Sequence, residues 1–462
     1  MNTMRTIYTI LFLMCSLSWV QSLFATETFV INGTGGFIWI KDGSACPIIV
    51  DEAEDKGVLR AVANLQSDAE RVTGVKPESG HASSSNRVFI IGSIDNSTWI
   101  QQLVKAGKLN AEDLQGKCEK YILTTVKKPL DGVDEAVVIA GSDKRGTIYG
   151  IYELSAQMGV SPWYYWADVP VRKQDVVSIK EGIYTDGEPA VKYRGIFLND
   201  EWPCLGGWAN MTFGGFNSKF YEKLFELVLR LKGNFLWPAM WNSAFYDDDP
   251  LNGPLANEMG IIMGTSHHEP MGLAQQDWKR RGTGEWNYKT NGKVLRDFWQ
   301  SGMERCKDWE SVITVGMRGD GDEAMSEGTN ISLLQNVVKD QQKIIEKVTG
   351  KKAKETPQVW ALYKEVQDYY DKGMRVPDDV TLLLCDDNWG NVRRLPSLDA
   401  KPRKGGYGMY YHFDYVGAPR NSKWINITQI QRTWEQMNLT YEHGVRELWV
   451  VNVGDFKPME YP

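Results

Sequence analysis

The chain has 462 residues, which is too long for one ordinary domain and points to two or three. Its 42% hydrophobic and 24% charged residues are typical of a soluble globular protein with a large core. The formal net charge of −7 disfavours a nucleic-acid-binding protein, because that class more often carries a basic excess. The 18 Trp and 20 Tyr residues suit stacking on sugar faces but are equally ordinary core material, so composition alone leaves a carbohydrate partner open.

The first residues have the pattern of a secretory signal peptide. Arg5 gives a short positive region, residues 7–19 are mostly apolar, and Ser22 or Ala25 provides a small residue for cleavage. The apolar stretch is too short for a membrane-spanning helix, and no other segment is long and apolar enough to span a bilayer. We therefore expect residues 1–25 to be removed and the protein to be secreted or periplasmic.

Cysteine usage argues against a disulfide framework and against a zinc site. Removal of Cys15 with the signal peptide leaves five cysteines without paired spacing, namely Cys46, Cys118, Cys204, Cys306 and Cys385. One incidental disulfide remains open. Cys15 follows the bulky Met14, which is a poor match to a lipidation box, so a surface lipoprotein is the less favoured alternative.

Residues 26–188 are expected to form a small α/β sandwich domain, because short apolar strands are interleaved with amphipathic helices. The predicted elements are, in order, a helix over 58–72, strands over 87–93, 121–125 and 136–140, and a helix over 146–158. The polar, glycine-containing segment 180–189 is predicted to be a linker.

From residue 189 to residue 462 the pattern changes to alternating strands and helices. Short apolar runs predict eight strands, over 193–198, 234–237, 260–264, 312–316, 358–363, 380–385, 407–412 and 448–453, with helices over 218–231, 294–309 and 429–443. This alternation is typical of a (β/α)8 TIM-type barrel. Because the chain stops at Pro462, directly after the eighth run, we expect the barrel to lack its last helix and the chain to be part of a longer protein.

Each predicted strand ends in polar and aromatic residues, at the face of a barrel where active sites are built. Any single carboxylate there is more simply explained as a polar loop residue that caps the next helix. That explanation does not account for Trp and His recurring beside carboxylates around the whole ring. Glycoside hydrolysis needs one carboxylic acid to protonate the leaving oxygen and a second carboxylate as base or nucleophile. Chemistry alone does not choose among the seven rim candidates, which are Asp200, Glu201, Asp322, Glu323, Glu365, Asp386 and Asp387.

The run from His267 to Glu269 could suggest a metal site. Adjacent side chains on an extended segment point to opposite sides, so one ion would not easily bind both histidines. A helical zinc signature needs histidines four residues apart, and the acidic run over 318–323 resembles a calcium loop only superficially. The glycine-rich segment 206–215 lacks the spacing of a phosphate loop. We therefore predict no metal and no cofactor.

Several long segments resemble glycoside hydrolase family 115. They are YRGIFLNDE (193–201), NFLWPAMW (234–241), GTSHHEPM (264–271), GMRGDGDE (316–323), DDNWG (386–390), YYHFDY (410–415) and VNVGD (451–455). The segment GSDKRGTIYGIY (141–152) is similar to the small α/β domain that precedes the barrel in that family. A related domain precedes the barrels of family 20 hexosaminidases and family 67 glucuronidases, so this part of the resemblance is less specific.

The resemblance implies a xylan α-1,2-glucuronidase, which removes glucuronic acid or its 4-O-methyl form from glucuronoxylan or xylo-oligosaccharides with inversion. The positions that it implies as functional are Asp200, His267 or His268, Arg318, Asp322, Glu365, Asn388, His412 and Tyr415, and Trp241 is a further substrate-binding candidate. Full members of the family continue into a helical domain and a β domain. We therefore expect a full-length form that is a homodimer through those domains.

Glucuronate is an anion, so its pocket needs a cation and hydrogen-bond donors, which Arg318, His412 and Tyr415 could supply. Inversion requires two carboxyl groups about 6.5–9.5 Å apart, with room for a water molecule. We predict that Asp322 or Glu365 is the acid and that Asp200 positions or activates the water.

Two other functions stay open on the sequence. Asp322 and Glu323 form the adjacent acid pair that a hexosaminidase on the same architecture would need. A truncated barrel could also be a non-catalytic glycan-binding protein, which would bind xylan and release no product.

Overall fold

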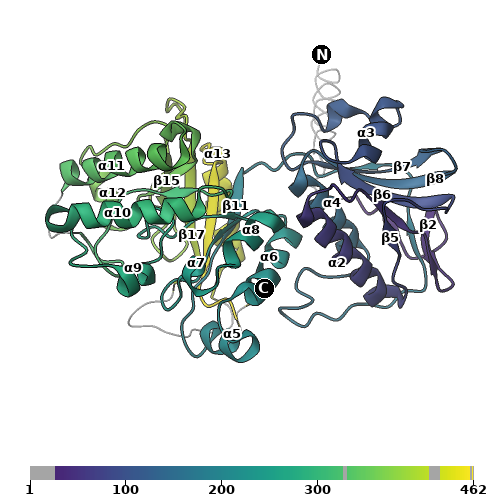
Figure 1. Ribbon diagram of the computed structural model, residues 1–462, viewed down its shortest axis with the longest axis horizontal. Helices are drawn as coiled ribbons and strands as arrows, with labels where there is room; N and C mark the ends of the chain where they lie inside the picture. Colours follow the sequence, from purple (N-terminus) through teal and green to yellow (C-terminus); the bar gives the residue numbers. More distant parts are fainter. Residues whose placement is uncertain (1–26, 326–329, 416–426, 458–459, 461–462) are drawn as a thin grey trace, which may run out of the picture.

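The computed structural model describes residues 27–325, 330–415, 427–457 and 460. The chain forms an N-terminal α/β domain, drawn at the right of Figure 1, and a barrel, drawn at the left. The predicted signal peptide lies outside the described residues. No helix within the described ranges is long and apolar enough to cross a membrane. No disulfide joins any of the five cysteines in the same part of the chain.

Two sheets make up the N-terminal domain. The larger has the strand order β10-β7-β8-β6-β4-β5, with β4 (Ile48–Val50), β5 (Ser79–Gly80), β6 (Arg87–Ser93), β7 (Tyr121–Lys127), β8 (Glu135–Gly141) and β10 (Ile183–Tyr184). The smaller has the order β1-β9-β2-β3, with β1 (Val30–Ile31), β2 (Phe37–Lys41), β3 (Ser44–Ala45) and β9 (Val177–Ile179). The helices of the domain are α2 (Lys56–Thr73), α3 (Thr98–Lys105), α4 (Lys144–Gln157) and the 3₁₀ turn η1 (Ala111–Asp113).

Alternate residues of the central strands face opposite sides of the larger sheet. Phe89 and Ile91 of β6 belong to a core shared with α2, α4 and the smaller sheet. Val88 and Ile90 of the same strand pack instead with α3. The predicted α/β fold of this domain is therefore confirmed. The interpretation of residues 180–189 as a linker is wrong in part, because β10 pairs antiparallel with β7 and forms the edge of the larger sheet.

Eight parallel strands form the barrel, and all of them match predicted runs. They are β11 (Tyr193–Phe197), β12 (Phe235–Trp237), β13 (Ile262–Met263), β14 (Ile313–Thr314), β15 (Gln358–Ala361), β16 (Thr381–Cys385), β17 (Tyr407–Asp414) and β18 (Leu448–Val453). The strand order is β13-β12-β11-β18-β17-β16-β15-β14. A parallel bridge between Met263 and Ser311, with a bond of 2.9 Å from Val312 N to Met263 O, closes the ring.

Large side chains from the strands fill the interior of the barrel, as a TIM-type fold requires. They include Tyr193, Phe197, Phe235, Trp237, Ile262, Val359, Leu383, Tyr410 and Val450, all of which are buried. The connections carry α5 (Leu205–Phe213), α6 (Ser218–Arg230), α7 (Phe245–Asp248), α8 (Asn252–Met259), α9 (Gln275–Arg281), α10 (Tyr288–Cys306), α11 (Ile331–Thr349), η2 (Ala353–Glu355), α12 (Glu365–Asp371) and α13 (Ile430–Glu442).

The connections depart from the prediction in two ways. Helix α11, between β14 and β15, was not predicted, although its buried face has helical spacing, and neither were the shorter helices α8 and α12. No helix lies between β16 and β17, where residues 386–406 are all described. Pro396, Pro402 and the pair Gly405-Gly406 explain this second departure, because proline and glycine disfavour helix interiors.

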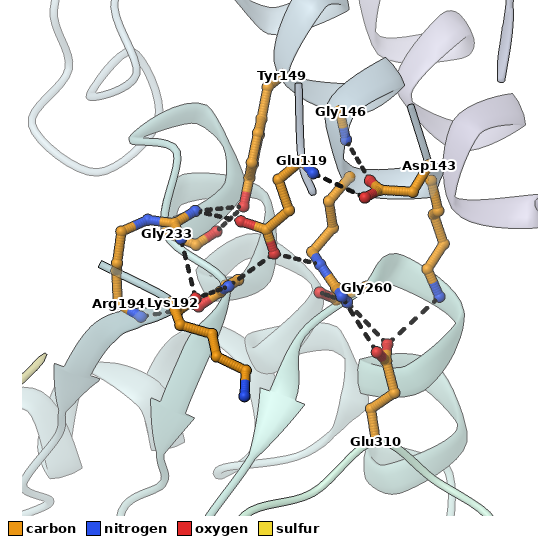
Figure 2. Close-up of polar contacts among 12 residues, drawn as sticks. Glu119, Asp143, Gly146, Tyr149, Lys192, Arg194, Gly233, Gly260 and Glu310 are labelled. Atoms are coloured by element: carbon orange, nitrogen blue, oxygen red, sulfur yellow. Dashed lines mark hydrogen bonds and ion pairs between the residues drawn. The ribbon is translucent and has the colours of Figure 1, made fainter. Parts of the chain in front are cut away.

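A polar cluster around Glu119 joins the N-terminal domain to the end of the barrel where the strands begin (Figure 2). The Glu119 carboxylate accepts hydrogen bonds from Arg145 Nε at 2.7 Å and from Arg194 Nη2 at 2.6 Å. It also accepts one from Asn234 Nδ2 at 2.8 Å, and Arg145 pairs further with Glu310. Arg194, Asn234 and Glu310 lie at or just before the starts of their barrel strands. The N-terminal domain is therefore attached at the face opposite the carboxyl ends of the strands.

Candidate active site

Most of the predicted site residues come together at the carboxyl ends of β13 to β17. Aromatic rings form the floor of this group, with centroids 4.2 Å apart for His267 and Tyr363, 5.4 Å for His267 and Tyr410, and 4.5 Å for Tyr410 and His412. Because parallel strands end at the same face of the barrel, residues far apart in the sequence converge here.

Arg318 holds two of the predicted catalytic carboxylates. Its Nε lies 2.8 Å from Glu365 Oε1 and its Nη2 lies 2.7 Å from Glu365 Oε2, which is a bidentate pair. Its remaining Nη1 contacts Asp322 Oδ1. Both carboxylates therefore engage different edges of one guanidinium whose side chain is only 3% exposed. Arg318 was predicted to bind the substrate carboxylate, but its donors are directed at these two protein carboxylates.

Asp322 is presented by a tight turn after β14. Gly321 and Asp322 both have positive φ, at 72° and 71°, and Gly319 N donates to Glu323 O at 2.7 Å across the turn. Asp322 Oδ1 lies 2.9 Å from His267 Nε2, and its Oδ2 lies 3.2 Å from Lys364 Nζ. Asp322 is thus surrounded by donors from β13, β14 and β15, and its ion pairs favour the ionised carboxylate.

The two adjacent histidines point toward the same carboxylate, so the expectation that they point apart is wrong. His268 Nδ1 lies 3.8 Å from Asp322 Oδ1, and the two imidazole centroids are 4.8 Å apart. The reason is that the chain turns at residues 267–268, where Glu269 N donates to Ser266 O at 3.1 Å, instead of continuing as a strand. Glu269 supports this turn by accepting from Ser266 Oγ and from Gln275 N.

Both histidines are held neutral by their surroundings. Burial lowers the pKa of His267 well below its usual value, and the charges of Arg318 and Lys364 lower it further. Burial and the same neighbours also lower the pKa of His268. A neutral His267 that bonds to Asp322 through Nε2 must donate from that nitrogen, which leaves Nδ1 as an acceptor. Nδ1 of His267 and Nε2 of His268 have no hydrogen-bond partner among the described residues.

Ligand atoms of His267, His268 and Asp322 lie within 4.8 Å of one another, which is close enough to share a metal ion. The charges around them oppose this use. Arg318 and Lys364 both contact Asp322, the carboxylate of the cluster, and two cations at contact distance repel a divalent ion. The predicted absence of a metal stays a prediction, and the electrostatics favour it.

A second polar group lies beside the first, on β16 and β17. Asp386 Oδ1 lies 2.6 Å from His412 Nδ1, and its Oδ2 accepts from His412 N at 3.0 Å. His412 Nε2 is buried and has no hydrogen-bond partner in the described part of the chain. The aspartate therefore fixes Nδ1 as the donor nitrogen and presents Nε2 as an acceptor.

The remaining substrate-binding candidates border these groups. The Asn388 side chain hydrogen-bonds to Tyr363, and the ring of Tyr415 lies 5.9 Å from that of His412. Trp241 stacks on His268, with centroids 5.7 Å apart and an interplanar angle of 27°. Its indole nitrogen has no hydrogen-bond partner within the described ranges. All three therefore border the aromatic floor.

Asp200 is the predicted catalytic residue that the structure does not bring into contact with the others. Its carboxylate accepts from Trp241 N at 3.0 Å, Asn242 N at 2.9 Å and Ser243 Oγ at 2.7 Å. The side chain is 1% exposed, and burial raises its pKa. These bonds anchor the loop after β12 that carries Trp241. Its role with water stays a prediction, and its contacts favour a role in positioning the loop.

Glu201 is another rim carboxyl with a displaced pKa. Burial and the neighbouring Asp455 carboxyl raise the pKa of Glu201 to about 9. Its backbone N–H donates to Asp455 Oδ1 at 3.0 Å, which ties the end of β11 to the loop after β18. This pair belongs to the β11–β18 side of the mouth, whereas the Arg318 cluster belongs to β13, β14 and β15.

Sequence reasoning missed Lys364 and did not single out Asp386. Lys364 stands beside the predicted acid Glu365, and a cation next to a candidate acid was a signal that could have been used. Asp386 was one of seven rim carboxylates, and nothing in the sequence pairs it with His412, which lies 26 residues away.

Comparison with known proteins identifies the family of this chain. Residues 186–462 match the model of glycosyl hydrolase family 115, which is more than half of the chain. The chain belongs to glycosyl hydrolase family 115. Residues 44–154 match the glycosyl hydrolase family 67 N-terminus, so both parts of the predicted resemblance are confirmed. A comparison with curated proteins gave no match.

Among solved structures, this family 115 chain is similar to BtGH115A, a family GH115 4-O-methyl-α-glucuronidase with specificity for decorated arabinogalactans. The TM-score is 0.82 and the sequence identity 33%, over 94% of this chain and 56% of that chain. The chain thus spans little more than half the length of this relative.

The N-acetyl-β-hexosaminidase of Streptomyces plicatus has a TM-score of 0.52 and 12% identity, over 92% of this chain and 84% of its own. The GH20 enzyme of Streptomyces coelicolor gives the same TM-score and identity, over 92% and 85%. At this level of identity, these two show the shared fold alone.

Proposed function

We propose that this family 115 chain hydrolyses the α-1,2 bond of glucuronic acid or 4-O-methylglucuronic acid side chains on xylan, with inversion. The observation that carries the proposal is the pair Asp322 and Glu365, held by the single guanidinium of Arg318 at the mouth of the barrel. Family membership supplies the reaction class, and the two carboxyl groups supply the groups that glycoside hydrolysis requires.

In this proposal Glu365 is the general acid. Its side chain is 21% exposed, against 14% for Asp322, and among the described residues its ion pair is with Arg318 alone. Asp322 contacts both Arg318 and Lys364, which suits a carboxylate that stays ionised. The choice between these two residues as the acid was open on the sequence, and their different partners favour Glu365.

Water activation is assigned to His412, supported by Asp386. The carboxylate of Asp200, predicted for this role, already accepts three hydrogen bonds. His412 Nε2 is buried and faces no hydrogen-bonding group among the described residues, while Asp386 keeps its Nδ1 as the donor. A neutral imidazole in this tautomer can accept a proton from water as general base. This assignment moves the proposed base from the loop after β11 to β17.

The identity of the polysaccharide that carries the glucuronate is a separate question. Xylan follows from the motif resemblance, whereas BtGH115A has specificity for decorated arabinogalactans and is similar over 94% of this chain. Arabinogalactan is therefore the second candidate substrate. The hexosaminidase reading is not favoured, because the family 20 structures are similar at 12% identity only.

Export and assembly are part of the proposal. The signal-peptide pattern of residues 1–25 supports a secreted or periplasmic protein, and the resemblance to family 115 supports a homodimer of the full-length form. Cell fractionation and light scattering test these two points directly.

The test of the function is release of free uronic acid from glucuronoxylan and from arabinogalactan by the wild-type chain. We expect release from at least one, and a loss of about 100-fold or more in kcat for Glu365→Ala and for Asp322→Ala. Full activity in both variants would contradict the assignment of the two carboxylates. Binding of the polysaccharide by a folded chain without any product would favour a glycan-binding protein.

A further inference from the structure

A cavity of about 730 Å³ lies at the junction of the N-terminal domain and the barrel, at the end of the barrel opposite the candidate active site. Residues at or just before the starts of β11 to β14 line it from the barrel side, namely Tyr193, Asn234, Ile262 and Ile313. The C-terminal ends of α10 and α11 and the segment 188–192 line it as well. Domain junctions are common places for ligand sites, and this volume falls within their usual range of about 300–1,000 Å³. The cavity is therefore large enough for a small-molecule ligand.

Six carboxylates line this cavity, and five of them are engaged by the protein itself. These five are Glu119, Asp143, Glu188, Glu310 and Glu355. Glu119 and Glu310 both pair with Arg145, in the network that Figure 2 shows. Glu188 has its own ion pair, and the other two accept hydrogen bonds from backbone N–H groups. The sixth carboxylate, Asp308, has no hydrogen-bond or ion-pair partner among the described residues.

Three cations that line the same cavity have no carboxylate partner in the described part of the chain. They are Lys307, Lys351 and Arg446. Lys307 and Lys351 lie at the C-terminal ends of α10 and α11, where a positive charge also stabilises the helix dipole. Arg446 lies on no helix, and its guanidinium carbon is 3.7 Å from the centroid of the Tyr441 ring. Helix stabilisation therefore does not explain all three cations, and against their charges the cavity has one unengaged carboxylate.

The basic character of the cavity continues along the chain beside it. Residues 347–354 contain four lysines and no acidic residue, in a chain whose formal net charge is −7. The four are Lys347, Lys351, Lys352 and Lys354, and all of them are exposed. Val348, Thr349 and Lys351 of this segment line the cavity. Exposed charges of one sign attract ligands of the opposite sign from a distance, so this segment favours the approach of an anion.

We propose that this cavity is a second saccharide site, which binds an acidic oligosaccharide through the carboxylate of a uronic acid residue. The inference rests on the proposed function, because that function identifies uronic acid-bearing chains as the saccharide that the protein meets. Lys307, Lys351 and Arg446 bind the carboxylate by charge-assisted hydrogen bonds. The cavity lies at the starts of the barrel strands and the candidate active site at their ends, so both sites can hold saccharide at the same time. Such a site keeps the protein on an acidic polysaccharide while the mouth of the barrel exchanges one uronic acid for the next.

The test is a calorimetric titration that counts binding sites. An aldotetraouronic acid is titrated into Glu365→Ala protein, in which cleavage is slowed, and into the same protein with Lys307→Met and Lys351→Met added. We expect two sites per chain in the first protein and one in the second, because the loss of two charged donors weakens binding in the cavity roughly 100-fold. The matched control adds Lys105→Met and Lys108→Met instead, which are exposed lysines of the N-terminal domain that do not line the cavity.

The number of sites separates this inference from the proposed hydrolysis. If the mouth of the barrel binds no uronic acid, then the Glu365→Ala protein has one site and the lysine variant has none, which still supports the cavity. An unchanged number of sites in the lysine variant overturns the proposal. So does equally tight binding of neutral xylotetraose at the site that the lysine substitutions remove, or occupation of that site by inorganic phosphate and not by the aldouronic acid. Thermal unfolding of each variant checks that the protein is folded.

Discussion

Asp386 contacts His412 twice, through Nδ1 at 2.6 Å and through the backbone nitrogen at 3.0 Å. The two bonds fix the ring both in tautomer and in orientation, and they join β16 to β17 at the mouth of the barrel. Asp386 is 2% exposed, so little solvent competes for these bonds. If His412 is the base that activates water, then its basicity depends on a residue that does not itself contact the substrate.

Asp386→Asn should therefore reduce activity strongly while leaving the fold intact. The amide can donate to Nδ1, which would favour the tautomer with the proton on Nε2 and remove the acceptor. We expect kcat to fall about 100-fold or more, with a smaller effect on KM. Asp399→Asn, in the same connection between β16 and β17 but exposed, serves as control. Unchanged kcat in Asp386→Asn would exclude His412 as the base.

Asp200→Asn tests whether that carboxylate positions the loop after β12 or acts on water. An amide cannot accept all three of the hydrogen bonds that Asp200 accepts, so we expect a loss of about 1–3 kcal/mol in the free energy of unfolding. The KM should rise because Trp241 is no longer held in place, and kcat should change less than tenfold. A complete loss of kcat with unchanged thermal stability would instead support the catalytic role predicted from the sequence.

Glu269 makes stability depend on pH. Burial raises its pKa in the folded protein from 4.5 to about 8. Below pH 4.5 the Glu269 carboxyl is protonated in both the folded and the unfolded protein. Between pH 4.5 and about 8 it is ionised in the unfolded protein but still protonated in the folded one. The free energy of unfolding therefore falls as the pH rises through this range. We expect the free energy of unfolding of the wild type to decline relative to Glu269→Gln across this window. Denaturant titrations at pH 5 and pH 8 measure this difference, and a difference that is constant with pH would be evidence against it.

Glu119→Ala should weaken the attachment between the N-terminal domain and the barrel. The substitution leaves Arg145 and Arg194 without the carboxylate that they share, and their side chains are only 15% and 19% exposed. Removing one partner of a buried ion pair lowers the free energy of unfolding by about 3 kcal/mol. Chemical denaturation should show the loss, and limited proteolysis should release the N-terminal domain earlier. Glu70→Ala, an exposed position on α2, is the matched control, and equal effects in both variants would argue against a special role for Glu119.

The barrel could be predicted from the sequence because each strand is a short apolar run that ends in polar residues. Two of the misjudged connections have clear local causes. Helix α11 has buried Leu334, Val337, Val338 and Ile345 at helical spacing, so the signal for it was present and was not used. A helix could be expected in the connection after β16, as in the neighbouring connections, only if Pro396 and Pro402 are ignored.

The sequence indicated which residues form the candidate site, but not which of them contact one another. His267 and His268 meet at one carboxylate because the chain turns there, and a strand pattern gives no sign of that turn. The pairing of Arg318 with Glu365 spans 47 residues and two βα loops, so the sequence shows both groups without showing that they neutralise each other. That pairing is also the reason why Arg318 is a poor candidate for the substrate carboxylate.

The most direct test of the central claim is to follow the anomer of the uronic acid that is released from intact glucuronoxylan by NMR at early times. Inverting cleavage of an α-linked glucuronate predicts that the β-anomer appears first and then equilibrates with the α-anomer. Appearance of the α-anomer first would contradict inversion, and the absence of any free uronic acid from a folded chain, on arabinogalactan as well, would contradict the proposed glucuronidase.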